Sequence, residues 1–209
     1  MNMKEKIEII QQLDKQKAFE QLKTPQELLE FMGRNIEYGF VSSKDKKKYS
    51  WKDKEMGEKF EEEYFLQNPA ELIESGYGVC WDSAELEREW FAKQGYDFKV
   101  YFMMFAKDEP NDLPTHTFLV YKVDDKWYWF EHSDGGNRGI HKYDSLENLL
   151  RSAKERHFQY AQSDRGAKPE DKNVIVIKDF DKPRFGCKPQ EFVDQVFADK
   201  DKVLDKSGM

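Results

Sequence analysis

The chain has 209 residues, enough for one substantial domain, and its 36% of charged residues against 38% of hydrophobic ones predicts a heavily charged surface. An aromatic fraction of 15% supplies much of the bulk for a core. The net charge is −7 and the densest basic stretch, 44–48, is interrupted by Asp45, so the charge pattern argues against a nucleic-acid partner.

The first residues lead into an amphipathic pattern rather than an apolar one, and no stretch holds 18 uncharged apolar residues. We therefore expect no signal peptide, no membrane span or membrane partner, and a cytoplasmic location. In that compartment Cys80 and Cys187 are expected to stay reduced, which disfavours a disulfide between them.

The first third of the chain is predicted to be mostly helical. Apolar residues spaced among charges up to about residue 22 are typical of a surface helix. Two capping-box patterns with proline at the first helical position, 24–27 and 68–71, predict helices that end near residues 38–39 and at 75–76. Between them we expect a lysine-rich, irregular loop with a short helix, and a further helix over 58–66.

A glycine-punctuated turn, Gly76-Tyr77-Gly78-Val79, leads into Cys80, which opens a predicted helix running to Lys93. A thiol at a helix N-terminus lies at the positive end of the helix dipole, which lowers its pKa and favours the thiolate. A cysteine nucleophile suits that position. Taken alone, this stretch is explained equally well if Cys80 is a small, buried hydrophobic residue.

Beyond Gly95 the residue pattern changes from helical to strand-like. We predict strands over 98–105, 115–123, 127–132 and 173–178, a helix from 144 toward His157, and a last helix from Gln190. This order indicates an α+β fold with a helical N-terminal part and a cysteine-bearing helix packed on an antiparallel sheet. We expect a single domain over 1–209, with an N-terminal helical extension and a core at about 68–178.

A cysteine nucleophile needs a base within hydrogen-bond reach and a group that orients the base. His116 begins the second strand beside a proline-containing loop, a rim position that suits a general base. His157 lies in a charged helical stretch and is predicted to be a surface residue, and His141 is predicted to be structural or exposed.

The register of the hairpin over 115–132 decides which group meets His116. With a two-residue turn at 124–125, Glu131 lies diagonally beside His116 on the same face. With a three-residue turn, Asp134 lies opposite His116 and His132 turns to that face. Glu131 ends an apolar run in which an unpaired carboxylate is costly, and this favours an imidazole partner over a solvated strand end.

Three features in this order resemble the transglutaminase-like superfamily: Gly78-Val79-Cys80-Trp81-Asp82 opening a helix, a strand led by His116, and the run 127–130 ending in Glu131. The resemblance covers roughly residues 76–144. It implies the papain-like core of that group, in which a cysteine helix packs on an antiparallel sheet.

The resemblance also implies a function. Cys80 matches the nucleophile, His116 matches the base, and Glu131 stands where the family usually has aspartate. The implied reaction is acyl transfer on an amide or peptide bond of a peptide, protein or small amide substrate, with the Cys80 backbone N–H and a second, unidentified donor meeting the oxyanion. Val79 replaces the glutamine that precedes the Cys-Trp pair in animal transglutaminases, which favours hydrolysis over cross-linking.

Two other functions compete with this one. A zinc site would join Cys80 to histidines, but the sequence has no Cys-x-x-Cys or His-x-x-x-His spacing, so we expect no metal and no other cofactor. The alternative function is a non-catalytic transglutaminase-like binding or scaffold module. The approach of the Cys80 sulfur to the His116 ring discriminates the enzyme from the module.

Overall fold

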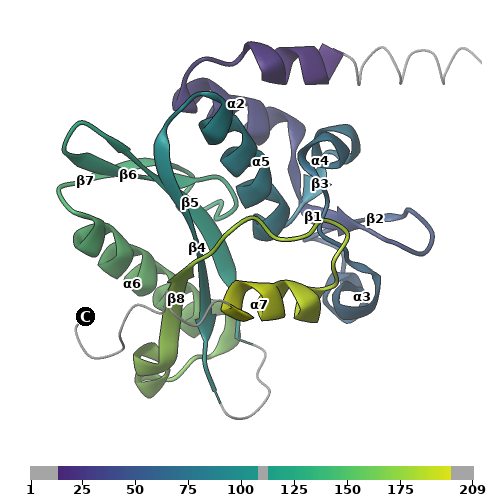
Figure 1. The fold of residues 1–209 in the computed structure, drawn as a ribbon. Coiled ribbons are helices and arrows are strands. Elements are labelled where there is room, and N and C mark those ends of the chain that lie inside the picture. Colours follow the sequence, from purple (N-terminus) through teal and green to yellow (C-terminus); the bar gives the residue numbers. More distant parts are fainter. Residues whose placement is uncertain (1–13, 108–112, 199–209) are drawn as a thin grey trace, which may run out of the picture.

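A computed structural model describes residues 14–107 and 113–198 of the chain (Figure 1). After a helical stretch over residues 14–21, the helices are α2 (Pro25–Asn35), α3 (Met56–Glu63), α4 (Pro69–Ser75), α5 (Cys80–Lys93), α6 (Leu146–Arg165) and α7 (Pro189–Ala198), with a 3-10 helix over Pro169–Val174. The strands are β1 (Glu37–Val41), β2 (Lys48–Ser50), β3 (Tyr77–Gly78), β4 (Asp97–Phe105), β5 (His116–Val123), β6 (Lys126–Glu131), β7 (Gly139–Tyr143) and β8 (Ile175–Asp179).

The strands form two sheets. The larger has five antiparallel strands in the order β7-β6-β5-β4-β8. The smaller has the order β2-β1-β3, with β1 antiparallel to β2 and parallel to β3. The predicted α+β fold, with its antiparallel sheet and cysteine-bearing helix, is confirmed.

Helices cover both faces of the five-stranded sheet. Figure 1 shows α6 on one side of β4 and β5, and α5, α7 and the three-stranded sheet on the other. Side chains alternate accordingly along β5, where Leu119 and Tyr121 join the core under α5, whereas Phe118 and Val120 join the core under α6. His116 begins this strand on the same side as Phe118, with its ring centroid 6.1 Å from that of Phe118.

The predicted helix starts are confirmed. Thr24 and Asn68 are N-caps, and each side chain accepts the backbone N–H of the glutamate three residues later. Each glutamate carboxylate in turn accepts the N–H of its cap residue. Gly76 ends α4 in the left-handed conformation, with φ of 68°, which places the chain to enter β3 and then α5.

Three predicted elements differ from the structure. The helix expected to end near residues 38–39 ends at Asn35, and the chain continues as β1, while part of the expected loop over 41–58 forms β2. These strands depend on pairing between distant segments, which the local pattern does not reveal. Strand β7, after the loop that follows β6, is an additional strand that the sequence did not predict. Helix α6 continues past His157 to Arg165.

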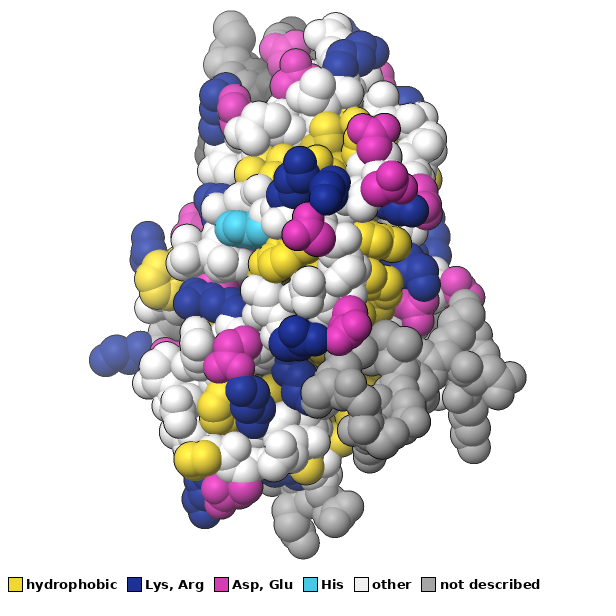
Figure 2. Space-filling model, turned by 90° about the vertical axis from the view of Figure 1, so that its left-hand side faces the viewer, with side chains coloured by type: hydrophobic (Ala, Val, Ile, Leu, Met, Phe, Trp, Pro, Cys, Tyr) yellow, Lys and Arg dark blue, Asp and Glu magenta, His cyan; other side chains and the backbone are white. Residues whose placement is uncertain are grey.

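The surface carries charges of both signs. Figure 2 shows acidic and basic side chains interspersed with small hydrophobic patches on the face that lies on the left of Figure 1, where β7 and α6 are found. Within residues 14–107 and 113–198, no helix combines the length and apolarity needed to cross a bilayer.

Candidate active site

Cys80 is the first residue of α5, and a buried carboxylate fixes the turn in front of it. Asp82 accepts the backbone N–H groups of Val79 (2.9 Å) and Gln67 (2.8 Å) and the hydroxyl of Tyr64 (3.1 Å). Burial raises the pKa of Asp82 to about 7, although these hydrogen bonds oppose the rise. Asp82 thus holds the start of the helix, and with it the position of the thiol.

The hairpin between β5 and β6 has a two-residue turn. Val123 pairs with Lys126, and Asp124 in the turn has a positive φ of 53°. This register puts Glu131 diagonally beside His116, and His116 Nε2 lies 2.8 Å from Glu131 Oε2. The structure therefore contains the first of the two predicted registers.

Glu131 is surrounded by donors. Its side chain is 1% exposed. Besides the His116 ring, Trp129 Nε1 donates to Oε2 at 3.1 Å, and the backbone N–H of Asp134 donates to Oε1 at 2.8 Å. Three donors compensate for the loss of water around a buried carboxylate, so Glu131 is held as a fixed acceptor for one ring nitrogen of His116.

The His116 ring links Glu131 to the thiol. Burial works to lower the pKa of His116, but the charge of Glu131 and hydrogen bonding with Cys80 and Glu131 outweigh it and hold that pKa well above the ordinary value. With Nε2 engaged by Glu131, Nδ1 is the ring nitrogen left for Cys80.

His157 corrects a prediction, because it is buried rather than on the surface. It lies on α6 with its ring centroid 6.3 Å from that of His116, and its Nε2 donates to the carbonyl of Pro114 at 3.1 Å. Burial and the charge of His116 lower the pKa of His157 to about 3, so it stays neutral beside the protonated ring. The sequence pattern around it, which is charged, concealed this contact with the sheet.

The side chains of the two residues of the other register have partners other than His116. His132 is buried with its Nδ1 3.5 Å from the hydroxyl of Ser83 on α5, and burial lowers its pKa to about 4. The carboxylate of Asp134 accepts two hydrogen bonds from Arg156, at 2.7 and 3.0 Å. Asp134 thus fastens the loop after β6 to α6, while its backbone N–H supports Glu131.

Residues 5–134 of the chain match a family model described as a transglutaminase-like domain. The chain belongs to the transglutaminase-like family. The matched segment contains Cys80, His116 and Glu131. A comparison with curated proteins gives no match.

Tyr38 is a residue of this transglutaminase-like site that sequence reasoning missed. It lies on β1, paired with Gly78 of β3, two positions before the cysteine. Burial raises the pKa of Tyr38 well above its ordinary value, the charge and side chain of Cys80 raise it further, and hydrogen bonding with the Cys80 backbone partly offsets this. No local signal marks Tyr38, because the parallel pairing that brings it to the thiol joins segments 40 positions apart (78 − 38).

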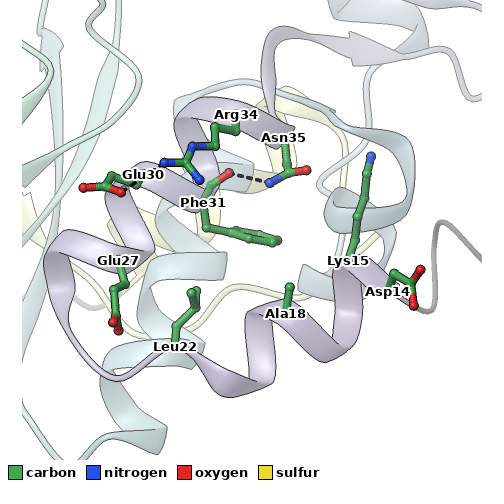
Figure 3. A pocket seen from close by; sticks show the side chains of 9 residues that line it. All are labelled: Asp14, Lys15, Ala18, Leu22, Glu27, Glu30, Phe31, Arg34 and Asn35. Atoms are coloured by element: carbon green, nitrogen blue, oxygen red, sulfur yellow. Dashed lines mark hydrogen bonds and ion pairs between the residues drawn. The ribbon is translucent and has the colours of Figure 1, made fainter.

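A large cleft of about 1860 Å³ contains Cys80, His116 and Tyr38. Its walls come from the β1–β2 hairpin, from the loop after β6 and from α6. A smaller hollow of about 440 Å³ lies between residues 14–22 and α2, where Ala18 and Phe31 approach each other (Figure 3). That hollow is lined by none of Cys80, His116 and Glu131, so the candidate site lies in the cleft.

Among the described residues, no group of three or more histidine, cysteine, aspartate or glutamate side chains is placed to hold a metal ion.

Trp81, next to the thiol, stacks on Phe192 of α7 at 4.3 Å between ring centroids and is 5% exposed. It therefore belongs to the core under α5, as was expected for a tryptophan in the first helical turn.

Proposed function

We propose that this transglutaminase-like chain is a cysteine enzyme that transfers an acyl group from an amide or peptide bond, with Cys80 as nucleophile, His116 as base and Glu131 as the group that orients His116. The observation that supports it is the position of the His116 ring, whose Nε2 lies 2.8 Å from Glu131 Oε2 and which lines the same cleft as Cys80. Nucleophile, base and orienting acid in this relation are the requirement for covalent acyl transfer.

In the proposed reaction the Cys80 thiolate attacks the carbonyl carbon and the C–N bond then breaks. The oxyanion of the tetrahedral intermediate accepts hydrogen bonds from the Cys80 backbone N–H and from the Tyr38 hydroxyl. We assign the Tyr38 hydroxyl as the second donor because it lies against both the side chain and the backbone of Cys80. The His116 imidazolium gives its proton to the leaving amine, and a thioester on Cys80 remains.

Water completes the cycle in the proposed hydrolysis. His116, neutral after the first step, takes a proton from the attacking water, and the C–S bond breaks to release a carboxylic acid and regenerate the thiolate–imidazolium pair. Val79, which stands where animal transglutaminases have glutamine, is the reason for proposing water rather than an amine as the acceptor.

The thiol assignment is tested by the alkylation rate of the folded chain with iodoacetamide at pH 7, followed peptide by peptide with mass spectrometry. We expect Cys80 to react faster than Cys187, which is 0% exposed. His116→Asn is expected to slow Cys80 alkylation about a hundredfold, since it removes the proton acceptor. His141→Asn is the matched control, because His141 Nε2 donates to the carbonyl of Asn137 instead.

Equal labelling of the two cysteines, or no effect of His116→Asn, would contradict the nucleophile assignment. The acceptor is tested with denatured casein as substrate, in the presence of a fluorescent primary amine. Release of ammonia or of new amino termini with little amine incorporation supports hydrolysis, and amine incorporation that dominates overturns it. A reactive Cys80 that produces neither favours the binding or scaffold module.

A further inference from the structure

The volume of the cleft indicates the size of its occupant. Sites for small molecules are typically about 300–1,000 Å³, and the cleft that contains Cys80 measures about 1860 Å³. Its lining extends from Trp51 after β2 to Tyr160 on α6. An extended polypeptide segment fills a cleft of this size and length better than a small amide does.

The cleft walls carry charged groups of both signs. Seven lysine or arginine residues and five aspartate or glutamate residues line the cleft. Asp134 is paired with Arg156 at 2.7 Å, and Asp164 lies 3.2 Å from the side chain of Arg165. Walls of mixed sign offer little selectivity for a strongly acidic or basic segment, so selectivity must come from other side chains.

Exposed aromatic residues provide that selectivity. Three large hydrophobic side chains in the described part of the chain are exposed: Trp51 (61%), Tyr160 (40%) and Val123 (39%). Two of these, Trp51 and Tyr160, line the cleft, whereas Val123 lies beside the β5–β6 turn. Large aromatic side chains left exposed in a cleft are suited to bind apolar groups of a ligand.

The register of the small sheet places Trp51 opposite Tyr38. Phe40 pairs with Tyr49 in the core, and the same antiparallel register continues to Tyr38, whose carbonyl accepts the Trp51 N–H at 3.0 Å. Facing residues of such a pair lie on the same side of the sheet. The row that begins in the core with Phe40 and Tyr49 thus ends at the cleft with Tyr38 and Trp51.

Tyr160 lines the same cleft from α6. Figure 1 shows α6 and the three-stranded sheet on opposite sides of β4 and β5. Trp51 and Tyr160 therefore belong to two different walls of the cleft that contains Cys80.

We infer that Trp51 and Tyr160 are specificity-determining residues, which bind large apolar or aromatic side chains of an extended polypeptide substrate beside Cys80. The inference rests on the proposed function, because it assigns the side chains recognised around the bond that Cys80 attacks. The two rings contribute apolar contact area, and the charges of mixed sign around them leave the charge of the substrate with little effect.

The test uses acetyl-Gly-X-X-Gly chloromethyl ketones in which X is Phe, Ser, Glu or Lys. The Cys80 sulfur displaces chloride, so that a C–S bond forms and a C–Cl bond breaks. We expect the Phe peptide to alkylate Cys80 about tenfold faster than the Ser peptide. Trp51→Ala and Tyr160→Ala are each expected to reduce this preference severalfold, and Val123→Ala, at the third exposed hydrophobic residue, is expected to leave it unchanged.

Iodoacetamide, measured in parallel on the same variants, separates the two proposals. Slow iodoacetamide alkylation of Cys80 in the unmodified chain would overturn the proposed function. Fast iodoacetamide alkylation with equal rates for the Phe and Ser peptides would overturn only the specificity inference. So would a preference that survives both alanine substitutions, or a faster reaction with the Glu or Lys peptide. Unchanged near-ultraviolet circular dichroism verifies that Trp51→Ala and Tyr160→Ala fold.

Discussion

Glu131, at the end of β6, and Glu87, on α5, are both buried carboxyl groups, with 1% and 2% of their surface exposed. Glu131 receives three donors, one of them the His116 ring. Glu87 has no hydrogen-bond partner for its Oε2 atom. Burial raises the pKa of Glu87 well above the ordinary value, and the charge of Glu131 raises it further. Burial alone therefore yields a neutral acid, whereas burial with positioned donors yields a group that orients a base.

The largest effect expected from this comparison is on the reactivity of the thiol. Glu131→Gln removes the charge that raises the pKa of His116, and we expect Cys80 alkylation at pH 7 to fall about ten- to a hundredfold. Glu87→Gln makes the same substitution in a carboxyl whose pKa burial raises well above its ordinary value, and we expect a change of less than about twofold. Iodoacetamide rates and the titration of the His116 ring by NMR measure both effects. Equal losses in the two variants would contradict the comparison.

Much of the candidate site could be predicted because its determinants are local. A helix start at Cys80 and a two-residue hairpin turn depend on residues within a few positions of each other. Once the turn length is given, the alternation of side chains places Glu131 beside His116. The turn length itself was the open choice, and the positive φ of Asp124 in the structure decides it.

The missed parts depend on distant contacts. Strand β1 exists because Tyr38 pairs with Gly78 and Phe40 pairs with Tyr49, so its short sequence reads as the tail of a helix when its partners are unknown. His157 is buried because α6 lies on the sheet and the Pro114 carbonyl accepts a hydrogen bond from its ring, although its neighbours in sequence are charged. Both errors hid residues that line the cleft, since cleft walls are assembled from segments far apart in the chain.

A smaller effect is expected on stability at alkaline pH. The pKa of Glu87 is raised in the folded chain. The contribution of Glu87 to the free energy of unfolding is therefore fully present below its unfolded pKa of 4.5, and it is lost as the pH rises through the folded pKa. Glu87→Gln lacks this loss. We expect the variant to gain about 2 kcal/mol over the unmodified chain between pH 5 and pH 9, the scale on which buried unpaired charge destabilises proteins. Urea unfolding at the two pH values measures it, and parallel losses in both proteins would contradict it.

The smallest expected effect concerns the two stacked histidines. His157 has a pKa lowered to about 3, so its contribution to stability is present above the unfolded value of 6.5 and is lost as the pH falls toward 3. His157→Phe keeps a ring beside Phe105 but does not titrate, and it gives up the hydrogen bond to Pro114. At pH 8 we expect the variant to be about 1 kcal/mol less stable. Between pH 8 and pH 5 the free energy of unfolding of the unmodified chain should fall by about 2 kcal/mol, and that of the variant should not. The reason is that His157 takes up a proton in the unfolded state of the unmodified chain but not in its folded state. Urea unfolding curves of the two proteins that stay parallel over this range would show that His157 is protonated in the fold, and would remove the contrast between it and His116.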